Sequence, residues 1–516
     1  MLVLTLVGVL IALVQLALFA QLTHRHRIAT ALLGLIGTHT VIALGTQAVG
    51  IFIYPVVLGL HAATILGLLY WIDLPKVAML RTYVTKPWAW LKHADWYFIL
   101  LLVLAVSFLA LPHYNYSGLI SHATEPEQTL VEGYNYTYPY FSDEWYSIAL
   151  AQQTITDQGF PQTHPLAANT PPARNLEAPF HGLIAQLAVF FRLNLLEHYI
   201  ILSLIINTLI IGALYLVNRK LGAFPIAALI AAIGALFITT GANLPGLWNL
   251  LPITLGVLPL CLSFVFLMSN QRWLYLVASA LALVYYPPLI VFVLPILGLQ
   301  LIYNRRWLTT GASMIGLTIV AAGVVFILSG IGSNLSLTEL ARETLGTLWY
   351  RSYTPNALPQ YSLWNIVPGL TLLAALVGII QVRWHDRWLA TGIVIGFGFW
   401  LVYYQNDGRF IIEYQRAIVV TALLLTALSS LGWHTLLSWL VSGTKRWRVP
   451  QPTLAISMAT IVILLLLWPG YTQRDNWQQL TLLELATNKH LPPSAPGCAR
   501  IFVETSGALF LHHGGY

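Results

Sequence analysis

Long apolar runs recur along the whole chain, and no other feature of the sequence restricts its fold as much. About fourteen of them reach roughly 17–25 residues, the length that a helix needs to cross a bilayer. The composition agrees, because 58% of the 516 residues are hydrophobic, only 8% are charged and the mean hydropathy is +0.73. Soluble domains carry about 25% charged residues. The sequence therefore predicts an all-α polytopic membrane protein with spans at 2–21, 28–47, 50–71, 97–113, 198–217, 222–240, 250–268, 273–286, 288–303, 307–330, 362–381, 388–404, 417–441 and 453–469.

The stretch 273–303 can be counted in two ways. It is one apolar run broken at Tyr285-Tyr286-Pro287-Pro288, where the prolines remove backbone donors and bend the chain. If the stretch were a single tilted span, every later loop would change sides. Both counts stay open at this point, and the charge distribution bears on the choice.

Basic residues are distributed unevenly between the two sides of the fourteen-span arrangement. Lys and Arg collect in cytoplasmic loops, so the richer side is expected to be cytoplasmic. Both termini and the long loop 114–197 then lie outside the cytoplasm. The residues on the richer side are Arg25, Arg27, Lys76, Arg81, Lys86, Lys92, Arg219, Lys220, Arg272, Arg305, Arg306, Arg383, Arg387, Lys445, Arg446 and Arg448.

The same scatter of charge argues against some partners and pairings. The formal net charge is +7, but the basic residues form no patch, so no nucleic-acid partner is expected. The segment Met1–Ala20 lacks a basic n-region and a small-residue cleavage site, so we expect a retained first span. Cys261 lies in an apolar run and Cys498 in the tail, so we expect no disulfide between them.

The long loop 114–197 carries an acidic pair at the start of an amphipathic segment. Ser142 can cap a helix there, and Asp143 and Glu144 would occupy its first turn, at the positive end of the helix dipole. At least one carboxylate should stay ionised, which suits a general base. Acidic residues also favour helix starts without any function. A second interfacial helix is predicted from Pro179 to Arg192, so the loop is expected to form two helices lying on the membrane.

Two further outer loops and a tail complete the predicted outer surface. The loop 331–361 carries aromatic residues, Arg342 and Arg351. The segment 405–416 holds Arg409, Glu413 and Arg416 at a span boundary. The tail 470–516 is too small to bury a core of its own, so it is expected to pack on the outer loops.

The order of these features resembles the GT-C superfamily of membrane glycosyltransferases, which includes protein O-mannosyltransferases and the aminoarabinose transferases of lipid A. The similarity rests on Asp143-Glu144 followed by Trp-Tyr-Ser-Ile-Ala, on the second interfacial helix from Pro179, and on a span that ends at Asn218-Arg-Lys-Leu-Gly222. The two longest outer loops, 114–197 and 331–361, also match the first and fourth outer loops of that superfamily.

The resemblance implies a division of the chain into four parts. Residues 1–96 would be three extra N-terminal transmembrane helices, and 97–361 a GT-C-like core with its two outer loops. Residues 362–469 would be C-terminal transmembrane helices, and 470–516 a short extracytoplasmic tail. The extra helices and the short tail depart from many members of the superfamily, and they put the subfamily and the acceptor in doubt more than the fold.

The resemblance also implies a reaction: transfer of a sugar from a polyprenyl-phosphate donor to a hydroxyl of a lipid, glycan or protein acceptor on the extracytoplasmic side. Asp143 would be the base, and Glu144 would face polar backbone or the phosphate-binding arginines and position the helix. The leaving phosphate would be held by arginines, and other polar residues would contact substrate. The expected phosphate-binding residues are Arg416, Arg409, Arg351 and Arg342, and the expected substrate-binding residues are His164, His181, Tyr146 and Glu413.

Some alternatives remain open on the sequence alone. Arg416 could merely extend to the interface or pair with Glu413. No metal-ligand spacing stands out and no cofactor is expected, although a divalent metal stays an alternative. A multi-pass protein of a prokaryotic plasma membrane, rather than of the ER, is the expected setting. A transporter or lipid flippase, or an inactive protein with the same fold, is the competing function.

Overall fold

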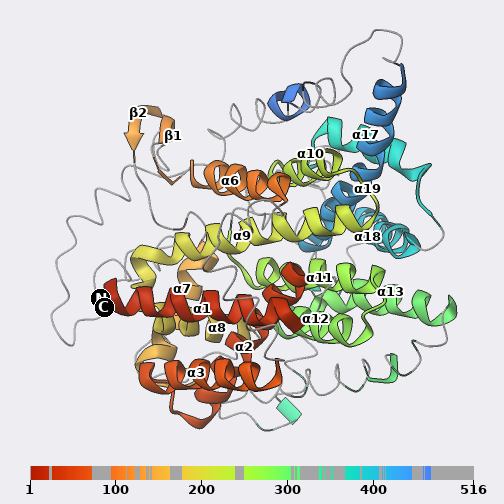
Figure 1. Ribbon diagram of the computed structural model, residues 1–516. Helices are drawn as coiled ribbons and strands as arrows, with labels where there is room; N and C mark the ends of the chain where they lie inside the picture. Colours follow the sequence, from red (N-terminus) through yellow and green to blue (C-terminus); the bar gives the residue numbers. More distant parts are fainter. Residues whose placement is uncertain are drawn as a thin grey trace.

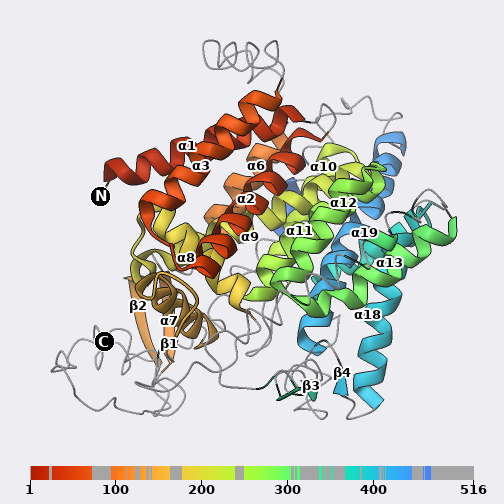
Figure 2. The same cartoon turned by 90° about the horizontal axis from the view of Figure 1, so that it is seen from below.

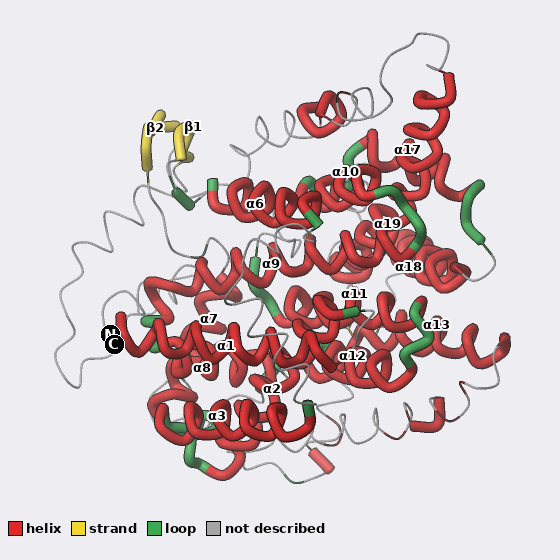
Figure 3. Tube along the Cα trace, in the orientation of Figure 1, coloured by secondary structure: helices red, strands yellow, loops and turns green. Residues whose placement is uncertain are grey.

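The computed structural model is helical almost throughout the part of the chain that it describes (Figure 1; Figure 3). The described residues form separate stretches of the chain. They are 2–22, 26–72, 95–111, 113–114, 116–121, 128–134, 139, 142–162, 165, 177–238, 249–303, 307, 309, 311–313, 316, 323, 336, 338–339, 342, 350–351, 366–383, 386–405, 409–410, 412, 414–443, 457 and 460–465.

The described helices follow the predicted apolar runs closely. Their bounds are α1 Leu2–Leu22, α2 Arg27–Val49, α3 Tyr54–Trp71, α6 Trp96–Ala110, α7 Ser142–Thr156, α8 Ala178–Phe191, α9 Leu195–Lys220, α10 Pro225–Leu236, α11 Pro252–Met268, α12 Arg272–Tyr285, α13 Ile290–Tyr303, α17 Gly369–Ile379, α18 Arg387–Gln405 and α19 Tyr414–Gly443. Among the described residues four helices are long and apolar enough to cross a membrane, namely α2, α3, α9 and α19 within Arg416–Leu440. The chain is therefore a helical membrane protein, as predicted, while the count of fourteen spans stays a prediction.

Local sequence signals account for several helix ends. Asp95 caps α6, since its carboxylate accepts from the backbone N–H groups of Tyr97 and Phe98 at 3.1 and 3.3 Å. The second oxygen of the same carboxylate accepts from the hydroxyl of Tyr215 at 2.8 Å, which ties α6 to α9. Proline stands in the first turn of α3, α8, α10 and α11, where its missing N–H costs no hydrogen bond.

The apolar stretch broken by prolines forms two helices. α12 ends at Tyr285, a short 3-10 helix covers Pro287–Leu289, and α13 begins at Ile290. Tyr286 lies between them with an extended backbone at φ −142° and ψ 86°, and its side chain is buried. The break predicted from the proline pair is therefore present. Tyr286, at the break, is only 2% exposed.

The described residues include two short antiparallel strand pairs, which the all-α prediction did not contain. β1 (Tyr116–Ser121) pairs with β2 (Gln128–Tyr134) beyond the end of α6. β3 (Tyr350–Arg351) pairs with β4 (Arg409–Phe410), with Arg351 opposite Arg409. The second ribbon joins two loops that the sequence analysis treated separately, because backbone pairing between distant segments leaves no periodic signal in either one.

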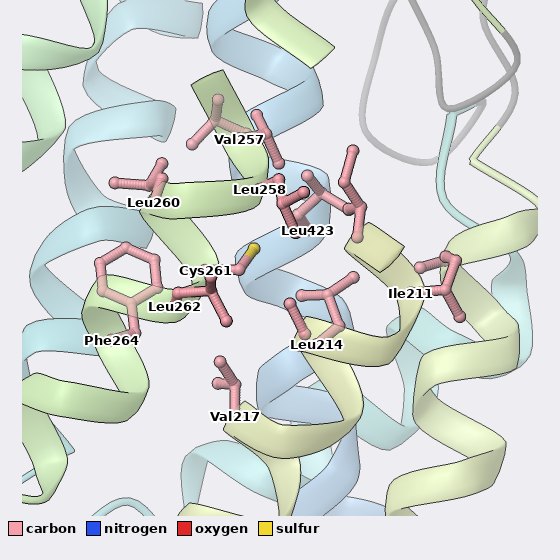
Figure 4. Packing of buried hydrophobic residues seen from close by; sticks show 14 of the residues in the cluster. Ile211, Leu214, Val217, Val257, Leu258, Leu260, Cys261, Leu262, Phe264 and Leu423 are labelled. Atoms are coloured by element: carbon pink, nitrogen blue, oxygen red, sulfur yellow. The ribbon is translucent and has the colours of Figure 1, made fainter. Parts of the chain in front are cut away.

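The helices pack as a bundle with an apolar interior. α9, α11 and α19 meet around Leu214, Val257, Cys261 and Leu423, and Figure 4 shows their side chains filling this region. α17 and α19 approach closely at two glycines, Gly378 and Gly432. A Cβ atom at either position would collide with backbone of the opposite helix. Small residues permit this kind of close helix contact in membranes.

The first three helices pack along one side of the bundle and against α8 (Figure 2). α7 and α8 are helical, as predicted for the loop 114–197, while their position at the membrane surface stays a prediction. They pack on each other and lie near one end of the long helices in Figure 2. This end of the bundle carries the site described next.

Candidate functional site

The first turns of several helices meet at one end of the bundle. Glu144 is the third residue of α7, Tyr199 the fifth residue of α9, and Arg416 the third residue of α19. Glu177 is the N-cap residue of α8, and Leu250 immediately precedes the N-cap of α11. Hydrogen bonds through Leu250 join the starts of α7, α9 and α11, and Arg416 of α19 lies near Glu177 of α8. We call this region the helix-start site.

Glu144 connects α7 to the segment that leads into α11. Its side chain is only 1% exposed, and its Oε1 accepts a hydrogen bond of 2.8 Å from the backbone N–H of Leu250. The carbonyl of Leu250 accepts from the Tyr199 hydroxyl at 2.6 Å. One peptide segment is thus held from both α7 and α9.

This contact bears on the expected role of Glu144. From the sequence, this carboxylate was expected to face the polar backbone of its own loop, or the phosphate-binding arginines. The structure places it against backbone, but the backbone belongs to a segment 106 residues further along the chain. A buried carboxylate needs such a donor, because an unpaired charge is costly in an apolar interior.

Arg416 lies between an acidic and an aromatic side chain. Its Nη1 is 3.9 Å from Oε1 of Glu177, and its Cζ is 5.2 Å from the centre of the Tyr286 ring. The ring distance is within the range of a cation–π contact. The oxygen distance is longer than the roughly 2.7–2.9 Å of a charge-assisted hydrogen bond. The guanidinium is therefore held over Tyr286 and attracted, rather than tightly bonded, to Glu177.

Tyr146 belongs to the same region. Its side chain is partly buried, and burial, followed by the charge of Glu177, raises the pKa of the Tyr146 phenol. The phenol is therefore a proton donor at neutral pH. The charges of both Glu144 and Glu177 also act on Tyr199. α7, which carries Glu144, packs on α8, which begins after Glu177, so the Glu144 contacts and the Arg416 contacts belong to adjoining helices.

Asp143 is the second residue of α7, so its backbone lies in the first turn beside Glu144. The position of its side chain is not described. Consecutive helix residues point about 100° apart. The expected division of roles between Asp143 and Glu144 stays a prediction.

The other predicted site residues are distributed as follows. Arg351 and Arg409 are direct partners in the β3–β4 ribbon, which describes their backbone and not their side chains. Arg342 is exposed, and its charge acts on Glu339. His181 is 2% exposed on α8, and burial lowers the pKa of its imidazole to about 3, so the ring adds no positive charge. His164 and Glu413 lie outside the described residues, and so does the alternative pairing of Arg416 with Glu413.

Three residues of the helix-start site were missed by the sequence analysis: Glu177, Tyr199 and Tyr286. Glu177 stands two residues before the proline that opens the second interfacial helix, a position where an acidic residue faces the helix dipole. Tyr286 lies at the break that was noted only as a problem of counting spans. Tyr199 carries no local signal, because its contact with Leu250 joins residues 51 positions apart.

The groups at this site could bind an anion close to a carboxylate that accepts a proton. Helix N-termini present unpaired N–H groups and the positive end of the dipole, which attract anions. Arg416 adds a full positive charge, and Glu144 and Glu177 limit the net positive potential. Within the described part of the chain, no group of three His, Cys, Asp or Glu side chains could hold a metal ion.

Comparison with known proteins adds no assignment. No family model matches the chain, and no curated protein matches it with significant similarity.

Proposed function

We propose that this protein transfers a sugar from a polyprenyl-phosphate donor to an acceptor hydroxyl at the extracytoplasmic surface of the membrane. The observation that carries the proposal is the helix-start site itself. Five helix N-termini meet there, together with Arg416 and the acidic first turn of α7, in a chain of which only 8% is charged. Such a site suits a phosphate at the surface of an apolar bundle.

The proposed reaction is a substitution at the anomeric carbon. The acceptor oxygen forms the new bond to that carbon while the acceptor proton passes to the Asp143 carboxylate. The bond from the anomeric carbon to the phosphate oxygen breaks, and the polyprenyl phosphate leaves with the bonding electrons. A well-placed base contributes about 10²–10⁴-fold to such a rate. The phosphate is a good leaving group, so the main demand is for cations that hold its charge.

Arg416 is the proposed phosphate-binding residue of this site. Its guanidinium lies over the Tyr286 ring, and its 3.9 Å separation from Glu177 leaves the ion pair weak enough for a phosphate to compete. Tyr146, a neutral phenol beside Glu177, is proposed to hydrogen-bond the donor. Tyr146 lies near the start of α7 and Arg416 near the start of α19, and both helices begin at the same end of the bundle.

The β3–β4 ribbon supports a second cationic element. Its register pairs the backbones of Arg351 and Arg409, so the two loops that carry them lie side by side. We propose that both arginines join in holding the donor phosphate.

Asp143→Asn tests the proposal most directly. The substitution keeps the size and hydrogen-bonding capacity of the side chain but removes the proton acceptor, so turnover should fall by about 10²-fold or more while donor affinity persists. The measurement is the initial rate of transfer from a polyprenyl-phosphate sugar, with donor binding measured in parallel.

Asp157→Asn is the matched control, since Asp157 also belongs to the α7 region but bonds Gln153 and the backbone of Gln162 at its far end. Its rate should stay near that of the unmodified protein. A fully active Asp143→Asn variant would contradict the assignment of the base. Activity of the unmodified protein with a soluble nucleotide sugar alone would contradict the proposed donor.

A further inference from the structure

The three N-terminal helices meet the rest of the protein through polar groups in an otherwise apolar contact. His61 is the centre of this contact, and it is one of only two buried residues of α3, with Val57. The side-chain amide of Gln15 on α1 lies 3.1–3.2 Å from Nδ1 of His61. Nε2 of Gln186 on α8 lies 3.0 Å from Nε2 of His61. Both ring nitrogens are therefore engaged, one by α1 and the other by α8.

A second contact joins α2 to the same interfacial helix. Nε2 of Gln47 donates to the carbonyl of Gly182 at 2.9 Å. A Cβ at residue 182 would lie only 2.5 Å from Oε1 of Gln47, so the glycine allows this approach. Just beyond α2, the backbone N–H of Phe52 donates to the carbonyl of Gln158 at the end of α7, at 3.0 Å. The N-terminal helices thus hold both α8 and α7.

A third contact reaches the break between α12 and α13. The hydroxyls of Thr40 on α2 and Tyr285 on α12 hydrogen-bond each other. Tyr285 immediately precedes Tyr286, whose ring lies under Arg416. Glu177 opens α8, nine residues before Gln186. The two neighbours of Arg416 are therefore carried by elements that α2 and α3 hold in place.

The surroundings explain why polar contacts matter here. Between membrane helices the lipid is as apolar as the side chains, so close packing and hydrogen bonds decide the register of the helices. Apolar packing tolerates sliding more readily than a histidine bonded on both sides. A shift of α8 along its axis would move Glu177 relative to Arg416.

We propose that His61 is a positioning residue: it fixes α8, and through α8 the Glu177–Arg416 pair, against the three N-terminal helices. The activity readout of this inference rests on the proposed function, whereas its structural readout does not. Through His61, Gln47 and Thr40, α3 and α2 accordingly position the proposed donor-binding site and are not an appendage.

His61→Leu tests the inference, because leucine fills the space but bonds neither glutamine. The KM for a polyprenyl-phosphate sugar should rise by about tenfold or more, since small displacements of binding groups are costly, while kcat changes much less. Hydrogen exchange of the backbone amides of residues 178–186 should accelerate. His61→Gln, which can still bond both neighbours, should restore both values in large part.

Gln21→Leu is the matched control, since Gln21 is a buried glutamine on the same helix as Gln15 and the described contacts do not join it to α8. It should leave the KM and the exchange of α8 unchanged. If His61→Leu fails to fold, Gln186→Leu provides the same two measurements.

The outcomes separate the two proposals. Unchanged exchange in α8 and an unchanged KM in His61→Leu would overturn the positioning role. A general loss of thermal stability with a normal KM in the folded fraction would also overturn it, since it would show a purely structural residue. If the unmodified protein transfers no sugar, the proposed function fails, and the exchange of α8 still decides whether His61 holds this helix.

Discussion

Glu144 and Leu250 are joined by a hydrogen bond of 2.8 Å between a buried carboxylate and a backbone N–H that lies just before α11. The bond joins the first turn of α7 to the buried segment that leads into α11. Leu250 is 0% exposed, so in the intact protein its N–H relies on this carboxylate and not on bulk solvent. The acidic pair of α7 therefore includes one member with a clear structural partner.

Replacing Glu144 by alanine should lower stability more than replacing it by glutamine. Glutamine keeps an oxygen that can accept from Leu250, whereas alanine leaves a buried N–H without an acceptor, at a cost of about 1–3 kcal/mol. In detergent, the unfolding temperature of Glu144→Ala should be lower than that of Glu144→Gln. Transfer rates should fall less in Glu144→Gln than in Asp143→Asn, and the reverse order would make Glu144 the base.

Arg416 should not be replaceable by lysine without loss. Lysine keeps the charge but not the flat guanidinium that lies over the Tyr286 ring. We expect Arg416→Lys to weaken binding of a polyprenyl phosphate, and Arg416→Gln to weaken it further, by about tenfold or more for a charge-assisted contact of about 1.5–3 kcal/mol.

Arg219→Gln serves as the control for this series, since Arg219 is exposed in the last turn of α9 and donates to the carbonyl of Ala223. Equal losses in Arg219→Gln and Arg416→Gln would point to a general surface-charge effect. Unchanged binding in Arg416→Gln would remove this arginine from the donor site.

The glycine pair between α17 and α19 should be sensitive to a single methyl group. A Cβ at Gly432 would meet the carbonyl of Ala374, and one at Gly378 would meet the carbonyl of Leu428. Gly432→Ala should destabilise the protein by about 1–3 kcal/mol through overpacking. Gly398→Ala on α18, where no atom lies within 4 Å, should be neutral or slightly stabilising, and equal stabilities for the two variants would contradict the close contact.

Features carried by local sequence were predictable. The apolar runs gave most helix positions to within a few residues, and the proline pair after Tyr286 gave the break before α13. Ser142 and Pro179 marked the starts of α7 and α8. Each of these signals depends on residues that are neighbours along the chain, so periodicity and helix-end rules are sufficient.

The missing parts depend on contacts between distant segments. The partner of Glu144 lies 106 residues away, and the neighbours of Arg416 come from the start of α8 and from the α12–α13 break. The β3–β4 ribbon joins residues 351 and 409 across two helices. Nothing within any one of these segments specifies its partner. The sequence could propose Arg416 for the site but not Glu177 or Tyr286.

The side of the membrane on which the helix-start site lies can be tested with α19, which runs from Tyr414 to Gly443. A helix of 30 residues spans about 45 Å, which is long enough to cross a bilayer, so its two ends should face opposite sides.

In a background without Cys261 and Cys498, Ser142→Cys at the start of α7 should react with an impermeant thiol reagent on intact cells. Ser442→Cys, exposed at the far end of α19, should react only after permeabilisation. Ser494→Cys in the tail should behave like Ser142→Cys. Protection of both Ser142→Cys and Ser494→Cys on intact cells, with labelling of Ser442→Cys, would reverse the orientation inferred from the basic loops and place the site on the cytoplasmic side.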